Sequence, residues 1–170
     1  MNKIIFSILI FTIALSTPSI GQILKVEVEG EARFTNFQNY TIEAGNDFPS
    51  SIESESEVHI SMGYNNLLNT GNNPNQKWRL TIQKSDLTWN PGLNLEARRT
   101  GNGFKRKGAG NPNITDGMTY QAVTNNPVYF FRGRDEIQYI PIQLKVNGFS
   151  LLMGASDFET SIVLTVYDDW

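Results

Sequence analysis

The chain has 170 residues with 14 basic and 17 acidic side chains, a net charge of −3 at pH 7, and no cysteine. The missing cysteine excludes disulfides, thiolate metal sites and a cysteine nucleophile, and the mild acidity argues against general nucleic-acid binding. Asn, Thr, Gly and aromatic residues are plentiful while good helix formers are sparse, which favours β structure with long polar loops.

The first 21 residues have the pattern of a secretory signal peptide. Lys3 precedes an apolar run over 4–15, and the small residues Ser19 and Gly21 follow. This run is shorter than the roughly 20 residues that span a bilayer. We therefore predict cleavage after Gly21, a mature single domain over 22–170, and export to the periplasm, the cell surface or the medium rather than integration into a membrane.

The mature chain opens with an alternating strand. Leu24, Val26 and Val28 alternate with charged residues over 23–30, the period of a strand with one buried face. Further strands are expected at 40–44 and at 58–62, the second one preceded by acidic residues at 53, 55 and 57 that are typical of an exposed edge.

The clearest internal strand is 77–84, where Trp78, Leu80 and Ile82 share one face. Trp89 begins a turn, Trp89-Asn-Pro-Gly, and 93–97 resumes the alternation. We expect 100–113 to be a loop, with strands following at 118–123 and 128–131.

The last third alternates most regularly. Ile140, Ile142, Leu144 and Val146 precede Asn147-Gly148, and Ile162, Leu164 and Val166 repeat the period. Asn-Gly tolerates the positive φ of a tight turn, which predicts a hairpin followed by a long final strand. Eight to ten strands without a convincing helix predict an all-β fold, a two-sheet antiparallel β-sandwich.

Catalytic signatures are weak. His59 is the only histidine, and it lies within a predicted strand without a recognisable nucleophile motif. Carboxylates that could act in pairs in glycoside hydrolysis are Asp135-Glu136, Asp157/Glu159 and Asp168-Asp169. We interpret them as exposed solvating charges, because adjacent acids on a strand point to opposite faces. A non-enzymatic protein with no cofactor and no metal is the prediction, and a hydrolase is the remaining rival.

Two groups of residues are candidates for ligand binding. The basic residues Arg98, Arg99, Lys105, Arg106 and Lys107 could contact an anionic surface glycan or a lipid phosphate, or form a solvated loop. Trp89, with Tyr64 or Tyr120, could stack on a sugar ring, or pack under its own loop. These aromatics and the Asn-rich loops make a carbohydrate-binding module the alternative function.

The ending of the chain resembles a known group of proteins. Phe158-x-Thr160-x-Ile162-x-Leu164-x-Val166-Tyr167, after Gly154 and behind an Ile-Pro-Ile-x-Leu strand, resembles the C-terminal strands of secreted bacterial spore-coat-U-like and pilin-like sandwiches. The resemblance implies an immunoglobulin-like or pilin-like topology and an exported structural or adhesive subunit. It also implies partners that are copies of the chain or other cell-surface proteins, with Leu24, Val26 and Val28 on a strand that would complete a neighbour's sheet.

Overall fold

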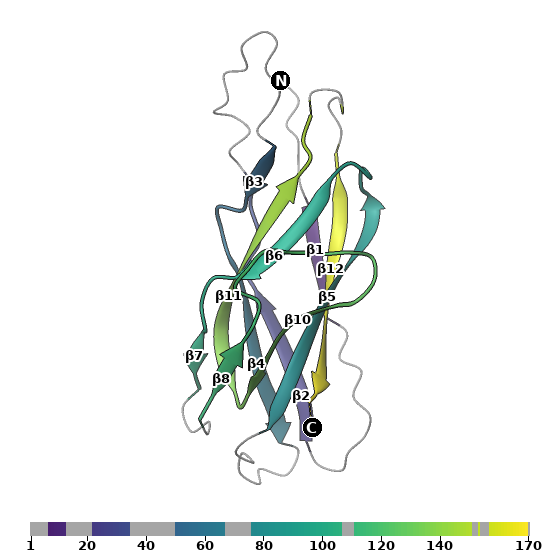
Figure 1. Ribbon diagram of the computed structural model, residues 1–170. Helices are drawn as coiled ribbons and strands as arrows, with labels where there is room; N and C mark the ends of the chain where they lie inside the picture. Colours follow the sequence, from purple (N-terminus) through teal and green to yellow (C-terminus); the bar gives the residue numbers. More distant parts are fainter. Residues whose placement is uncertain are drawn as a thin grey trace.

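The computed structural model describes residues 7–12, 22–34, 50–66, 76–106, 111–150, 153 and 157–169, with the backbone alone for 7–12, 22–23 and 64–66. The predicted strand at 40–44 and the residues Lys107 and Trp170 lie outside these ranges. The described residues form two β-sheets and no α-helix, which confirms the all-β, two-sheet prediction (Figure 1).

The first sheet has the order β1-β12-β5-β10-β8. Its strands are β1 (Ser7–Thr12), β12 (Glu159–Asp168), β5 (Lys77–Thr88), β10 (Val128–Arg134) and β8 (Asn113–Thr115). All of its pairs are antiparallel except β1 with β12, which is parallel.

The second sheet has the order β2-β4-β11-β6-β9, and all its pairs are antiparallel. Its strands are β2 (Gln22–Glu29), β4 (Val58–Asn66), β11 (Ile137–Asn147), β6 (Asn94–Arg99) and β9 (Gln121–Ala122). The short strands β3 (Ser51–Glu53) and β7 (Phe104–Lys105) also pair with β11, which makes β11 the centre of this sheet.

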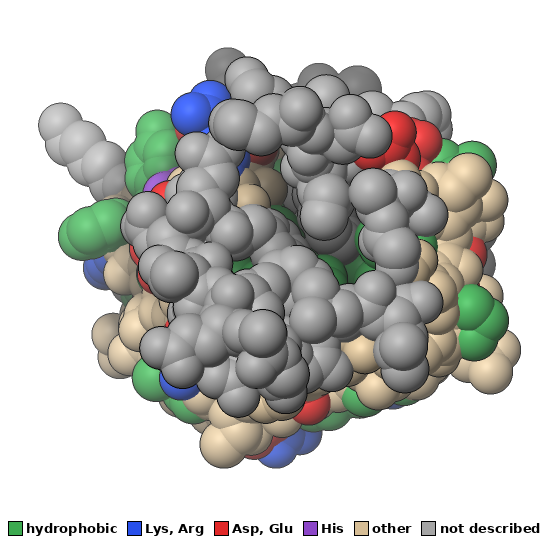
Figure 2. All heavy atoms as spheres, turned by 90° about the horizontal axis from the view of Figure 1, so that it is seen from above, with side chains coloured by type: hydrophobic (Ala, Val, Ile, Leu, Met, Phe, Trp, Pro, Cys, Tyr) green, Lys and Arg blue, Asp and Glu red, His purple; other side chains and the backbone are tan. Residues whose placement is uncertain are grey.

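One apolar core lies between the two sheets. Alternate residues of β5, β11 and β12 point into it, because successive side chains of a strand face opposite ways. Trp78, near the start of β5, is fully buried in this core, where it contacts the Phe131 ring edge-on and donates from Nε1 to the Asp135 carbonyl oxygen at 2.9 Å. In the view of Figure 2, the charged side chains that can be seen lie toward the periphery, with both signs present.

The predicted C-terminal hairpin is wrong. Gly148 does take a positive φ of 93°, but its N–H bonds to the Ser50 carbonyl, and the chain then crosses to the other sheet. β11 therefore pairs with β4 and β6, while β12 pairs with β5 and β1. The alternating pattern identified the inward faces of both strands, but it carries no information about which strand lies beside which.

The expectation of exposed carboxylates at Asp135 and Glu136 is also wrong. Both are only 4% exposed, because a positive φ of 59° at Asp135 interrupts the strand alternation between β10 and β11. Asp135 Oδ2 accepts a hydrogen bond from the Asn111 N–H at 2.9 Å, and Glu136 pairs with Arg106 at 3.0 Å. These partners offset the cost of burying the two charges.

Two shorter predictions also need correction. The strand expected at 118–123 is limited to β9, and the loop expected at 100–113 contains β7 and ends at β8. These strands are two or three residues long, too short for any periodicity to appear in the sequence.

Candidate functional site

Arg98 and Arg99 are neighbours on β6, and the strand sends their side chains to opposite faces. Arg98 lies on the outer face, where it donates to Gln143 Oε1 at 2.7 Å and covers the Tyr120 ring at 4.4 Å. Arg99 points inward and is 4% exposed. These two basic residues are adjacent in the sequence but lie in different environments, one on the outer face of the sheet and one buried.

Arg99 is enclosed by backbone and amide oxygens. Its guanidinium donates to the carbonyls of Asp116 and Gly101 and to Asn102 Oδ1 at 2.5 Å. Burial lowers the pKa of Arg99, although the nearby Asp116 carboxylate acts in the opposite direction. These contacts fasten β6 to the turns that follow it, which is a structural role.

The remaining basic residues of the predicted cluster are also separated. Arg106 is paired with the buried Glu136, while Lys105 is exposed on β7. Together with the positions of Arg98 and Arg99, this means that the described members of the cluster do not form one surface.

Tyr120 contacts two cations on the outer face of the second sheet. The Lys145 Nζ atom is 4.2 Å from its ring centroid and the Arg98 guanidinium carbon is 4.4 Å from it, and Lys145 also pairs with Glu96 at 2.6 Å. Burial raises the pKa of the Tyr120 hydroxyl to about 12, and the neighbouring Glu53 carboxylate adds to the rise. The ring is thus occupied within the chain. The Tyr64 side chain lies outside the described residues.

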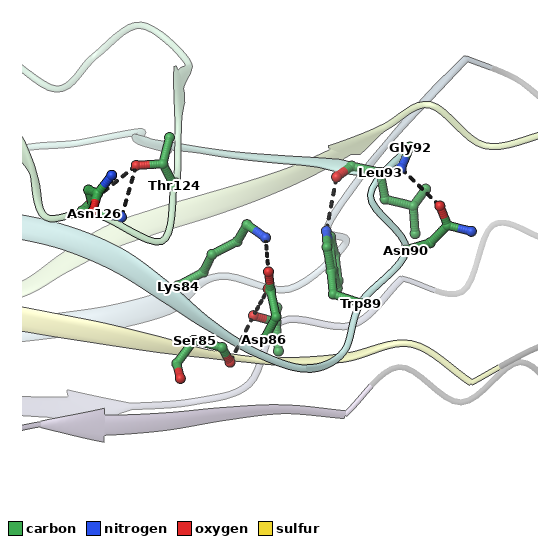
Figure 3. A network of polar contacts seen from close by, with 10 residues as sticks. Lys84, Ser85, Asp86, Trp89, Asn90, Gly92, Leu93, Thr124 and Asn126 are labelled. Carbon is green, nitrogen blue, oxygen red and sulfur yellow. Dashed lines mark hydrogen bonds and ion pairs between the residues drawn. The ribbon is translucent and has the colours of Figure 1, made fainter.

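Trp89 is half-buried at the end of β5, in the network shown in Figure 3. Its Nε1 donates to the Leu93 carbonyl at 2.9 Å, and the Lys84 Nζ lies 5.3 Å from its ring centroid. Lys84 also reaches Asp86 at 2.5 Å, and Asp86 accepts a hydrogen bond from Thr160 at 2.9 Å. A hollow of about 280 Å³ adjoins this network, lined also by Thr124 and Asn125.

Hydrogen bonds set the protonation of Asp86. Its partial burial would raise the carboxyl pKa, but hydrogen bonds from Lys84, Thr160 and Asn125 outweigh that effect, and the pKa is lowered from its ordinary value. The Asp86 carboxylate is therefore favoured in its ionised form. In this form it accepts the hydrogen bond from Thr160 that links β5 to β12.

The residues of the predicted assembly strand lie within the chain's own second sheet. β2 pairs with β4 along its whole length, from Gln22 opposite Asn66 to Glu29 opposite His59. Leu24 and Val26 are buried in the core, and Val28 packs against it.

A strand pairing that the sequence did not single out lies along β12. Among the described residues, β12 is paired with β5 on one side and with the outer strand β1 on the other (Figure 1). The parallel register places Ile8, Ile10 and Thr12 opposite the buried residues Thr160, Ile162 and Leu164. β1 and β12 both also contact β2, at the side of the sandwich where the two sheets approach each other.

The composition of β12 differs from that of β2, the outer strand of the other sheet. β2 carries Lys25, Glu27 and Glu29 at alternate positions, and such charges discourage pairing with a further strand. β12 has no charged residue between Glu159 and Asp168. The alternating sequence identified β12 as a strand, but its position next to the outer strand β1 depends on the sheet order.

Comparison with known proteins gives no relative: no protein family, curated protein or solved structure matches the chain. Within the described ranges, no helix has the length and apolar character needed to cross a membrane. The same residues contain no group of three or more His, Asp or Glu side chains placed to hold a metal ion.

Proposed function

We propose that the protein is an exported, non-enzymatic structural or adhesive subunit of the cell surface, and that it self-associates by strand addition along β12. The carrying observation is that β1, which hydrogen-bonds along 159–164, belongs to the segment predicted to be removed as a signal peptide. Its removal would leave the backbone N–H and C=O groups of this edge unpaired. Such groups are a template for a strand from another molecule. The immunoglobulin-like or pilin-like type of the sandwich is part of the same proposal.

The uncharged composition of β12 supports this assignment. Ser161, Val163 and Thr165 lie on its outer face and are half-buried, so no side-chain charge opposes an incoming strand. Trp89 already contacts Lys84 and Leu93 within the chain. We therefore favour strand addition as the function, and carbohydrate binding through Trp89 stays the alternative prediction.

Sedimentation velocity of residues 22–170 over a range of concentrations tests the proposal. We expect association that increases with concentration and that is abolished in Val163→Lys, because a charge at the edge opposes pairing. The matched control is Gln83→Lys, since Gln83 lies opposite Val163 on β5, a strand that already has two neighbours. This control should associate like the unmodified chain.

A chain that stays monomeric at high concentration would contradict the proposal. So would equal loss of association in both variants, because it would point to the face of the sheet rather than to its edge.

A further inference from the structure

Four basic side chains lie together on the outer face of the first sheet. Lys77 and Arg79 flank the buried Trp78 on β5, and Arg132 and Arg134 flank Gly133 on β10. A Cβ atom on Gly133 would lie 2.5 Å from the Trp78 ring, so Gly133 faces the core and its two neighbours face outward. We call these four residues the cationic face.

The strand register sets like charges directly opposite each other. Arg132 is paired across the sheet with Arg79, and Arg134 with Lys77. Side chains at such positions have Cβ atoms about 5 Å apart, and like charges there destabilise a sheet. The fold therefore holds two repulsive pairs side by side.

Little within the described residues neutralises this charge. Arg132 is 3.8 Å from Asp116, but Lys77, Arg79 and Arg134 have no carboxylate within 4.0 Å there. Arg134 donates to the Asn111 carbonyl at 2.9 Å, and the Arg79 guanidinium lies 5.2 Å from the Tyr167 ring centroid. By contrast, Lys25, Arg33, Lys84, Arg106 and Lys145 each have a carboxylate partner.

The cationic face adjoins an open hollow of about 520 Å³. Its lining combines Lys77, Arg132 and Arg134 with the polar side chains of Asn113 and Thr115 and with one carboxylate, Asp169. Tyr129 and Tyr167, which are 43% and 38% exposed, lie on the same sheet. This surface therefore combines guanidinium and ammonium groups with hydroxyl groups, amide groups and partly exposed aromatic rings.

We infer that the cationic face binds an acidic polysaccharide through its carboxylate or sulfate groups. The arginine fork matches the geometry of these anions, Asn113 and Thr115 can hydrogen-bond to sugar hydroxyls, and two rows of cations suit a chain with repeated charges. The choice of a glycan as the ligand rests on the proposed function, since an exported adhesive subunit would meet such polymers. The inference that the ligand carries carboxylate or sulfate groups is independent of that function.

Binding of the full-length chain to immobilised heparin, a sulfated polysaccharide, and to polygalacturonate, a carboxylated one, tests this inference. The double variant Arg79→Gln/Arg134→Gln should bind at least tenfold more weakly to whichever polymer the chain retains. The matched control is Lys25→Gln/Arg33→Gln, which removes the same amount of positive charge from β2 and from the segment that follows it. This control should change the affinity less than twofold.

Equal weakening by the two double variants would overturn the inference, because it would show an effect of net charge alone. Failure to bind either polymer, or tighter binding to double-stranded DNA than to both, would also overturn it. None of these results depends on association along β12, so failure here is distinguishable from failure of the proposed function.

A thermal melt without ligand gives a second test. Lys77→Gln should keep or raise the melting temperature at low salt, with the difference shrinking at high salt, because the variant removes one repulsive pair. A clear fall in the melting temperature would show that Lys77 stabilises the fold, and it would contradict the assignment of this residue to ligand binding.

Discussion

Gly133 leaves room for the ring of Trp78, its cross-strand neighbour in the first sheet. An added Cβ would meet two Trp78 ring atoms at 2.5 and 2.7 Å and the Asn113 carbonyl oxygen at 2.8 Å. We predict that Gly133→Ala lowers the free energy of unfolding by about 1–3 kcal/mol, the usual cost of overpacking a core. Urea denaturation measures the change.

The matched control for this prediction is Gly63→Ala on β4. Its Cβ would approach only the flexible end of Arg106, at 3.8 Å, so the substitution should be neutral or stabilise by up to about 1 kcal/mol. If Gly133→Ala were no more destabilising than Gly63→Ala, the contact between Gly133 and Trp78 would not restrict the packing.

The lowered pKa of Asp86 predicts a specific pH dependence. A carboxyl group whose pKa is lower in the folded state stabilises the fold above its unfolded pKa, near 3.8, and this contribution disappears as the pH falls through the folded value. The melting temperatures of the unmodified chain and of Asp86→Asn should therefore differ at pH 7 and converge as the pH falls below 3.8 and through the lower folded-state value.

Asp157→Asn serves as the control, because it removes an exposed carboxylate outside the network and should change stability little at pH 7. A difference between Asp86→Asn and the unmodified chain that stayed constant down to pH 2 would show that the ionised form has no special role.

At the level of strands, the sequence was sufficient to predict the buried face of a strand wherever its periodicity was strong. The alternation in β2, β5, β11 and β12 correctly predicted which residues are buried, because burial of one face is what imposes a period of two. It could not predict that β11 and β12 belong to different sheets. That outcome depends on contacts distant in the sequence, such as the Gly148 N–H with the Ser50 carbonyl.

The candidate sites show the same limit. Arg98 and Arg99 attracted attention because they are adjacent, yet adjacency on a strand separates side chains. The spacing that brings cations together is i and i+2, as in Lys77-Trp-Arg79 and Arg132-Gly-Arg134. Each spacing is visible in the sequence, but the pairing of β5 with β10 that joins the two motifs is not. The place of β12 between β1 and β5 was hidden for the same reason.

At the level of the whole molecule, the two sheets share one core, so they should unfold together. Leu144 is 1% exposed on β11, whereas Trp78 lies on β5 of the other sheet. We predict that Leu144→Ala costs about 2–5 kcal/mol by leaving a cavity. Because the core is continuous, the urea midpoint measured by tryptophan fluorescence should shift as much as the midpoint measured by far-UV circular dichroism.

The conservative Leu144→Met should shift both midpoints far less, since it nearly preserves the buried volume. Separate fluorescence and dichroism transitions in Leu144→Ala would mean that the sheet containing Trp78 survives the loss of its partner. In that case the apolar residues of β5 and β12 would have enough packing among themselves, and burial between the two layers would not be what holds the sandwich closed.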